Sequence, residues 1–387
     1  MRLPVYLDYN ATTPVDTRVL TAMLPWFTEQ FGNAASRTHL YGWTAEEAVA
    51  KARKQVARLL NANPKEIVFT SGATEANNLA IKGVFEKLSY KGRHIITVAT
   101  EHKAVLDTCH HLEQLGAEVT YLIPSADGLI TSQQVAEVLR KDTILVSVMY
   151  ANNEIGVIQP IRELAAVTHQ AGALFHTDAT QAVGKLPLDV QAEGIDLLSL
   201  SAHKLYGPKG IGALYVRQGV EIISQMDGGG HERGRRSGTL NVPAIVGLGK
   251  ACELAQKEMK TESERLLLLR DRLESAVLEN VLDTVVNGNK IHRLSHLTNI
   301  CFEYIDGENL LLNLKDIAVS TGSACTSASV LPSYVLKNLG LSDDQAYASL
   351  RFSLGRFTTE EEIEFAIQHI GEVVGKMRMD VSGVSYS

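Results

Sequence analysis

The stretch Thr143-Ile-Leu-Val-Ser-Val-Met149 decides the fold, because it is apolar at nearly every position. A continuous apolar run bounded by polar turns is typical of a strand buried on both faces, in a mainly parallel sheet covered by helices. Similar runs alternate with helical patterns between residues 44 and 217, which predicts a three-layer α/β/α fold with a seven-stranded sheet. The seven strands are expected at Glu66–Thr70, His94–Thr100, Glu118–Ile123, Thr143–Tyr150, Ala173–Asp178, Leu197–Ser201 and Ile211–Arg217.

Helix signals divide the rest of the chain. The sequences Thr44-Ala-Glu-Glu47 and Thr131-Ser-Gln-Gln134 have the pattern of a capping box, which marks a helix start. After about residue 250 a pattern rich in Leu and charge predicts a long helix over Thr261–Glu279. We expect a large domain over residues 14–255, and a small α/β domain formed by residues 1–13 and 256–387. On the helix after Thr44, one face is expected to carry Ala48, Ala52, Val56 and Leu59.

Composition excludes several classes of protein. The 387 residues carry a formal net charge of −7, whereas a nucleic-acid-binding protein normally shows a basic excess. The one basic cluster, Arg233, Arg235 and Arg236, lies in a Gly-rich stretch and favours a small anion over a duplex. The N-terminal residues have no apolar signal segment, and no apolar run approaches the ~20 residues of a membrane span. We therefore expect a cytoplasmic protein without a membrane anchor.

Four cysteines are spread through the chain without a CxxC pair. In a chain of this length, that spacing argues against a disulfide scaffold and for a reducing compartment. Cys325 stands apart, because residues 320–329 are all small, and such a loop leaves a thiolate accessible. The other three are expected to be packing residues: Cys109, Cys252 and Cys301.

Polar clusters at the ends of two expected strands point to the chemistry. Lys204 follows directly on an apolar strand, and a lysine in a partly desolvated site can form a Schiff base. Asp178 ends a neighbouring strand at the same edge, where ligands of parallel sheets bind. It suits the carboxylate that keeps the ring nitrogen of pyridoxal phosphate (PLP) protonated. Taken singly, Lys204 would be read as a solvated surface group and Asp178 as a helix cap.

A third strand leads into Ser71-Gly-Ala-Thr-Glu75 and a helix, which could cradle a phosphate on free backbone N–H groups. Many strand-to-helix turns have this form, so the signal is weak alone. His102 follows a fourth strand at the same edge and could stack on a flat ring or move a proton. A single histidine of this kind more often has a structural role.

Seven motifs in order resemble the cysteine desulfurases of the NifS/IscS group, which are class-V aminotransferase-like PLP enzymes of fold type I. The resemblance extends from Tyr6-Leu-Asp-Tyr-Asn-Ala11 to Arg351-Phe-Ser-Leu-Gly-Arg-Phe357, nearly the whole chain. The motifs lie at Thr70–Glu75, Thr100–Ala104, Asn152–Gly156, His176–Gln181, Ser201–Lys204, Gly228–Thr239 and Gly322–Cys325.

The resemblance implies a role for each matching residue. Lys204 would form the Schiff base, Asp178 would pair with the ring nitrogen, Gln181 would bond the ring hydroxyl, and His102 would stack on the ring and move protons. Asn153 would contact coenzyme and substrate, and Arg351 would grip the substrate carboxylate, for which a bidentate guanidinium is suited. The phosphate would be held by Ala73, Thr74, Ser201 and His203, with Thr239 reaching across from a partner subunit of a homodimer.

The implied reaction converts L-cysteine to L-alanine and leaves the sulfur on Cys325 as a persulfide. The sulfur would then pass to an acceptor protein such as an iron–sulfur scaffold. Cys325 would at most ligate a cluster transiently, and no resident metal is expected. Well-known housekeeping members carry a longer acidic and aromatic C-terminal tail than the sequence ending at Ser387. We therefore expect that the sulfur could also go to another scaffold, to tRNA thiolation, or out as sulfide.

Four other functions compete with this one. A selenocysteine lyase would share the fold and the PLP site but would not need Cys325 for attack. A non-enzymatic sulfur carrier or scaffold would leave Lys204 and Asp178 unexplained. A nicotinamide dehydrogenase needs a G-x-G-x-x-G turn opening a helix, whereas Gly210-Ile-Gly212 precedes a strand. A metal hydrolase would need a second ligand cluster beside Cys109-His-His111.

Overall fold

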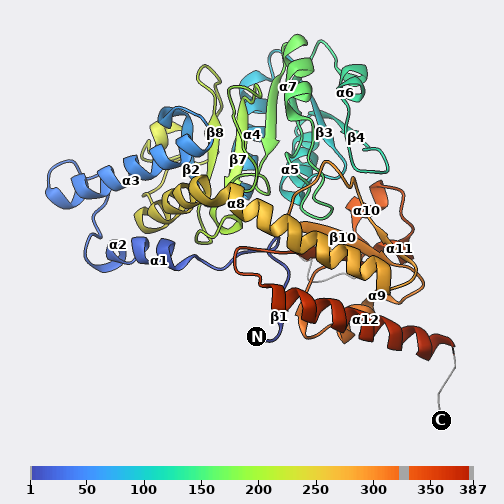
Figure 1. Ribbon diagram of the computed structural model, residues 1–387. Helices are drawn as coiled ribbons and strands as arrows, with labels where there is room; N and C mark the ends of the chain where they lie inside the picture. Colours follow the sequence, from blue (N-terminus) through green and yellow to red (C-terminus); the bar gives the residue numbers. More distant parts are fainter. Residues whose placement is uncertain (1, 322–330, 383–387) are drawn as a thin grey trace.

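A seven-stranded sheet forms the centre of the larger part of the molecule (Figure 1). The computed structural model describes residues 2–321 and 331–382. The strand order is β2-β8-β7-β6-β5-β3-β4, and every neighbouring pair is parallel except those that involve β8. The strands are β2 (Ile67–Thr70), β3 (His94–Val98), β4 (Glu118–Leu122), β5 (Thr143–Ser147), β6 (Leu174–Asp178), β7 (Leu197–Ser201) and β8 (Gly212–Val216).

The predicted fold class and all seven predicted strands are confirmed, with ends that differ by a few residues. Alternate side chains along each strand enter two separate cores, which is why the runs are apolar throughout. Ile67 and Phe69 of β2 belong to the core on one face, which also includes side chains of α3 (Leu40–Leu59), α6 (Ser132–Val138), α7 (Ile161–Gln170) and α8 (Val242–Asn280). Val68 belongs to the core on the other face, which includes side chains of α4 (Ala73–Leu88) and α5 (Lys103–Gln114).

One helix start was predicted correctly and one was wrong. Thr131 caps α6 with the reciprocal bonds of a capping box. Thr44, in contrast, lies inside α3, which begins at Leu40 after His39. The imidazole Nδ1 of His39 accepts from the N–H of Gly42, so His39 is the N-cap that was predicted at Thr44. The predicted apolar face is buried, with Ala48, Ala52, Val56 and Leu59 all in the core.

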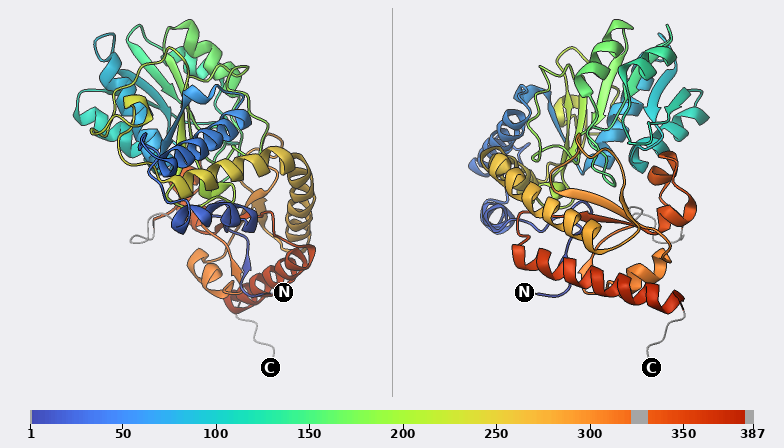
Figure 2. Two further views of the ribbon diagram at one scale, coloured as in Figure 1. Left: turned by 90° about the vertical axis from the view of Figure 1, so that its left-hand side faces the viewer. Right: turned by 45° about the vertical axis from the view of Figure 1, so that its right-hand side comes forward.

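A second core lies beyond the sheet, where Val5 and Leu7 pack with side chains from residues 266–374. Its three-stranded sheet has the order β12-β10-β9, and β1 pairs with β11 alongside. Figure 2 shows α12 in red at the far end of the molecule from the seven-stranded sheet, with the N-terminus nearby. The elements are β1 (Val5–Tyr6), β9 (Thr284–Val286), β10 (Leu297–Phe302), α9 (Gly307–Asn313), β11 (Ile317–Ala318), α10 (Tyr334–Asn338), α11 (Asp343–Tyr347), β12 (Ser349–Ser353) and α12 (Glu360–Ser382).

Helix α8 connects the two cores and begins much earlier than the predicted Thr261. Its first part, as far as Ala255, packs in the core of the large sheet, and the part after Leu266 packs in the second core. The proposed domain boundary at residue 255 therefore falls within one continuous helix. Cys109, Cys252 and Cys301 are buried, as predicted for packing residues.

Candidate active site

A cavity of about 570 Å³ opens at the carboxyl ends of the parallel strands, where the sequence placed the polar clusters. Side chains from both parts of the molecule line it, since Asn10 and Arg351 meet residues that follow β2, β3, β6 and β7. Most of the predicted site residues lie on its wall: Ala73, Thr74, His102, Asn153, Asp178, Gln181, Ser201, His203, Lys204 and Arg351.

Lys204 ends a short 3-10 turn (Ala202–Lys204) that follows β7. Its Nζ donates hydrogen bonds to the backbone carbonyls of Asn10 and Ala11, each at 2.6 Å. The N-terminal segment therefore holds the amine at the cavity wall. Backbone carbonyls accept from an ammonium without neutralising it, so no carboxylate among these contacts competes for its charge.

Asp178 is the last residue of β6 and is only 5% exposed. Its Oδ2 accepts from the side-chain amide of Asn77 at 2.7 Å, and its Oδ1 accepts from the N–H of Thr180 at 3.0 Å. These two donors fix the orientation of the carboxylate at the cavity wall. Asp178 is therefore placed to pair with the protonated ring nitrogen of a bound coenzyme.

The predicted cradle forms where β2 runs into α4. Gly72 is the N-cap of α4, so the N–H groups of Ala73 and Thr74 belong to the first turn, which attracts an anion. Ser201 and His203 approach the same cavity from the end of β7. Gly212 of the neighbouring β8 must lack a side chain here, because a Cβ would lie 2.7 Å from the Cα of Gly72. These two segments of the chain therefore approach each other closely at the cradle.

Two imidazoles line the cavity as predicted. The Nδ1 of His102 accepts from the N–H of Ala104 at 3.1 Å and caps α5. Desolvation, and then the positive charge of Lys204, lowers the pKa of His203 to about 4. His203 is therefore a neutral imidazole near pH 7 and can act as donor or acceptor toward a phosphate.

Arg351 lies on β12 and reaches the cavity from the second core. Its guanidinium donates to the carbonyl of Asn153 at 2.9 Å and pairs with Asp8 at 2.6 Å. The pairing with Asp8 was not foreseen from the sequence. Because arginine has five N–H donors, these bonds leave donors for a further carboxylate, and the buried Nε has no partner among the described residues.

Two predicted residues remain to be accounted for. Thr239 is exposed, on the segment between the 3-10 turn Glu232–Gly234 and α8, and it does not line the cavity. Cys325 lies outside the residues that the structure describes. Their predicted roles, in a partner's phosphate site and as sulfur acceptor, stay predictions.

The basic cluster in the Gly-rich stretch is largely engaged in internal contacts. Arg236 pairs with Glu75 in the first turn of α4 at 2.7 Å, and Arg233 donates to the carbonyl of Lys65 at 3.0 Å. The predicted preference of this cluster for a small anion stays a prediction.

The donors and acceptors on the wall fit PLP. Besides the Nε of Arg351, the Oδ1 of Asn153 and the Oγ1 of Thr180 are buried without a partner among the described residues. Buried polar atoms are normally hydrogen-bonded, so these atoms mark places where a polar ligand would be satisfied. An amine, a carboxylate and a helix N-terminus around one cavity match the aldehyde, ring nitrogen and phosphate of PLP.

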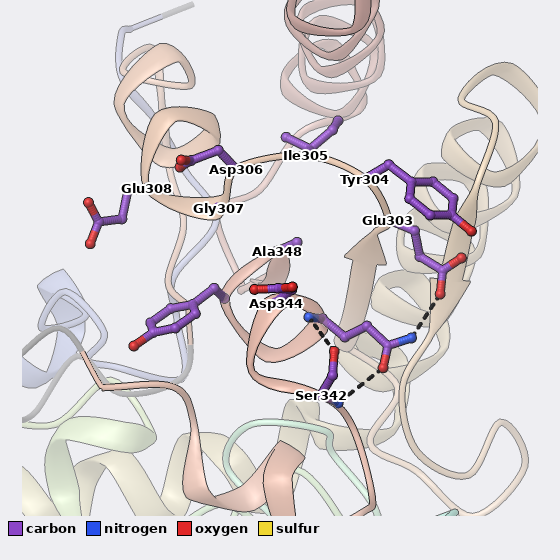
Figure 3. Close-up of a pocket in the computed structure, with 11 residues that line it drawn as sticks. Glu303, Tyr304, Ile305, Asp306, Gly307, Glu308, Ser342, Asp344 and Ala348 are labelled. Carbon is purple, nitrogen blue, oxygen red and sulfur yellow. Dashed lines mark hydrogen bonds between the residues drawn. The ribbon is translucent and has the colours of Figure 1, made fainter. Parts of the chain in front are cut away.

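A larger cavity of about 960 Å³ lies in the second core region, away from these residues (Figure 3). Four of its eleven lining residues are acidic, and the Gln345 amide bridges Glu303 and the backbone of Ser342. None of the predicted site residues lines it, and acidic residues alone do not specify a ligand. Groups of three or more metal-ligating side chains are absent from residues 2–321 and 331–382. Within the same ranges, no helix is both long and apolar enough to cross a bilayer.

Sequence reasoning missed three residues that hold the site together. Asn10 supplies a carbonyl to Lys204, Asn77 supports Asp178, and Lys185 donates to Gln181. Asn77 follows the cradle motif closely enough that a helix turn would have placed it inward. Asn10 and Lys185 act through non-local contacts, which no local pattern reports.

Known proteins match this chain along nearly its whole length. The class-V aminotransferase family model matches residues 5–365. A cysteine desulfurase IscS of Anaeromyxobacter dehalogenans (strain 2CP-C) is 57% identical over 381 residues, which cover 98% of this chain and 94% of that protein. A cysteine desulfurase IscS of Shewanella sp. (strain MR-4) is 56% identical over 382 residues, with the same coverage.

Solved structures share the architecture. A NifS-like protein superposes with a TM-score of 0.91 at 37% identity, covering 97% of this chain and 100% of that one. A structure described as SspA in complex with cysteine gives a TM-score of 0.82 at 42% identity, covering 92% of this chain and 100% of that one. At these identities and coverages, the proteins resemble this chain in sequence as well as in fold.

Proposed function

Because the chain belongs to the class-V aminotransferase family and is a PLP-dependent cysteine desulfurase, we propose that it moves sulfur from L-cysteine onto Cys325 and releases L-alanine. The observation that carries the proposal is the convergence of Lys204, Asp178 and Arg351 on one cavity. These side chains supply an amine, a carboxylate and a carboxylate-binding fork, which are the groups that amino-acid chemistry on PLP requires.

Bound PLP would supply an electron sink for the substrate, with its phosphate at the N-terminus of α4 and its ring nitrogen at Asp178. Arg351 would bind the substrate carboxylate through its remaining N–H donors, and Asn153 would fix the orientation of the substrate. Lys204 would move the proton at the substrate α-carbon, and His102 would stack on the ring and assist in proton transfer.

Sulfur transfer is assigned to Cys325 on the sequence, which gives it an accessible loop of small residues. Its thiolate would attack the substrate sulfur, forming an S–S bond while the C–S bond breaks. The electron pair of the broken bond stays with the substrate carbon, which takes a proton on the way to alanine. A persulfide remains on Cys325 and would pass to an acceptor protein, such as a scaffold that assembles iron–sulfur clusters.

A homodimer in the cytoplasm completes the proposal. Thr239 is exposed and does not line the cavity of its own chain, in keeping with a role in a partner's cradle. Large apolar side chains are exposed around α1 (Thr17–Met23), α2 (Pro25–Thr28) and the start of α3, and a dimer contact would cover such a surface. They are Leu20, Leu24, Phe27, Phe31, Leu40, Tyr41 and Trp43.

The test combines an absorbance spectrum with mass spectrometry. The purified protein should show a coenzyme band that changes on addition of L-cysteine, and Cys325 should then carry one added sulfur. Cys325→Ala should keep the band but release no sulfide. Full turnover by that variant would contradict the assignment of Cys325 and would favour a selenocysteine-lyase type of chemistry. A colourless protein would contradict the PLP site and would favour a sulfur carrier.

A further inference from the structure

Lys185 is a partly buried lysine that the reaction described above does not use. It lies in the loop after β6, four residues beyond Gln181, and its Nζ donates to the Oε1 of Gln181 at 2.8 Å. Desolvation, and then the positive charge of Lys204, lowers the pKa of Lys185 to about 7. A partly buried lysine with a lowered pKa is unusual on structural grounds alone, because most lysines keep the ammonium in water.

Hydrogen bonds join Lys185 to Lys204 through two intermediates. The Nε2 of Gln181 donates to the carbonyl of Asn10 at 3.0 Å, and the same carbonyl accepts from the Nζ of Lys204 at 2.6 Å. The network therefore runs from one lysine, through an amide and a carbonyl, to the other. It lies along the wall of the coenzyme cavity, of which Gln181, Asn10 and Lys204 are all part.

The direction of the Gln181 amide follows from the chemistry of Lys185. The Nζ of Lys185 donates to the carbonyl oxygen of the amide, which leaves the NH₂ group on the other side. The NH₂ group then faces the cavity wall at Asn10 and can donate only to acceptors there. Without Lys185, the amide would be free to turn over and present its oxygen instead.

The positive charge of Lys185 also affects the amine of Lys204. A second cation close to a reactive lysine disfavours the proton on that lysine, which is one of the ways proteins activate an amine as a nucleophile. The positive charge of Lys204 in turn disfavours the proton on Lys185.

We propose that Lys185 is a positioning residue for the coenzyme site, which fixes the NH₂ group of Gln181 toward the cavity and disfavours protonation of the Lys204 nitrogen. The inference rests on the proposed function, since it gives Gln181 and Lys204 their roles toward bound PLP. It adds a group that touches neither substrate nor coenzyme in that scheme.

Apart from Lys204, the other titratable groups that face Lys185 change their charge less near pH 7 than Lys185 itself does. Desolvation raises the pKa of both Tyr9 and Tyr206, and desolvation followed by the charge of Lys185 holds the pKa of His296 well below its usual value. These three are therefore neutral near pH 7. The carboxylate of Glu262 favours the charged form of Lys185 and the guanidinium of Arg351 opposes it. They are paired with Arg356 at 2.7 Å and with Asp8 at 2.6 Å, respectively.

The experiment is a pH titration of the absorbance of the bound coenzyme, which reports the proton on the Lys204 nitrogen. Lys185→Met removes the charge and the donor at nearly equal length, and should raise the pH midpoint by about one unit or more. Lys185→Arg keeps a permanent charge and a donor, and should leave the midpoint at or below that of the parent. Lys257→Met removes one charge from the exposed ion pair with Glu253 on α8 and serves as the matched control, with no shift expected.

A folded Lys185→Met variant with the midpoint of the parent would overturn the inference. If that variant does not fold, the arginine variant decides, because a raised midpoint there would refute a role for the charge. Coenzyme affinity, measured by equilibrium dialysis, gives a second readout that does not depend on turnover, and the methionine variant should bind more weakly than the arginine variant. The proposed function fails separately, through a parent protein without a coenzyme band or without a response to cysteine.

Discussion

Replacing Glu232 by glutamine removes one charge from a buried ion pair that ties the Gly-rich segment to β2. The Nη2 and Nη1 of Arg53 bind the Oε1 and Oε2 of Glu232 at 2.5 Å and 2.7 Å, and the two side chains are only 10% and 1% exposed. The Oε2 also accepts from the N–H of Phe69 at 2.8 Å. Since β2 leads into the phosphate cradle, the ion pair stabilises the strand from which the cradle begins.

The magnitude follows from what each variant leaves behind. Glu232→Gln leaves the guanidinium of Arg53 buried without its carboxylate, and breaking a buried pair in this way costs about 3–5 kcal/mol. Arg53→Met leaves the carboxylate unpaired and should cost a similar amount. The double variant carries no buried charge at this place, and the amide oxygen of the introduced glutamine can still accept from the N–H of Phe69. It should therefore recover most of the loss.

Urea unfolding, followed by circular dichroism, measures the free energy of unfolding of the parent, both single variants and the double variant. The double-mutant cycle should give a coupling energy of at least about 2 kcal/mol in favour of the pair. Single variants that each lose less than about 1 kcal/mol would refute the reasoning, because the pair would then behave as an exposed one.

Four further outcomes are expected. Lys204→Ala should abolish turnover, and borohydride reduction of the parent with bound PLP should label Lys204; a label on another lysine would contradict its role. Asn77→Leu removes a charge-assisted bond to Asp178 worth about 1.5–3 kcal/mol, so the dissociation constant for PLP should rise roughly 10- to 100-fold, and unchanged affinity would count against the bond. Desolvation lowers the pKa of buried His176 to about 4, so the unfolded state binds its proton first as pH falls. Stability should fall between pH 6.5 and pH 4 by up to about 3 kcal/mol from this group, and equal unfolding free energies at pH 7 and pH 5 would argue against it. Burial raises the pKa of Cys109 and Cys252 to about 12, so iodoacetamide at pH 8 should label Cys325 in the native protein and spare both, as peptide mapping would show.

The sheet was predictable from sequence because strands buried on both faces leave an unbroken apolar run. The start of α8 was not, because Gly249 lowers the helix propensity of its first half. Packing overrides propensity here: a Cβ on Gly249 would lie 2.6 Å from the Cα of Ala52, so the glycine allows α8 and α3 to approach closely. The capping role of His39 was missed for a similar reason, since histidine is a less common cap than Thr44.

The residues of the site also divide into those that a local sequence pattern predicts and those that it does not. Lys204, Asp178 and the turn at Gly72 each follow a strand, and parallel strands bring their carboxyl ends to one edge, so a local pattern sufficed. The pairing of Arg351 with Asp8 and the contacts of Lys185 depend on how distant segments pack, and the sequence carries no periodic signal for them.

Asn10 shows what this non-local packing achieves. Its carbonyl holds Lys204 and Gln181, its Oδ1 is bonded to His296 at 2.8 Å, and its Nδ2 donates to the carbonyl of Asn153 at 3.1 Å. One residue from the N-terminal segment thus contacts the amine, the amide and the carbonyl that also receives Arg351. Because the second core packs around that segment, stability there and geometry at Lys204 are linked. A change that loosens the second core should therefore move the Lys204 amine before it disturbs the parallel sheet.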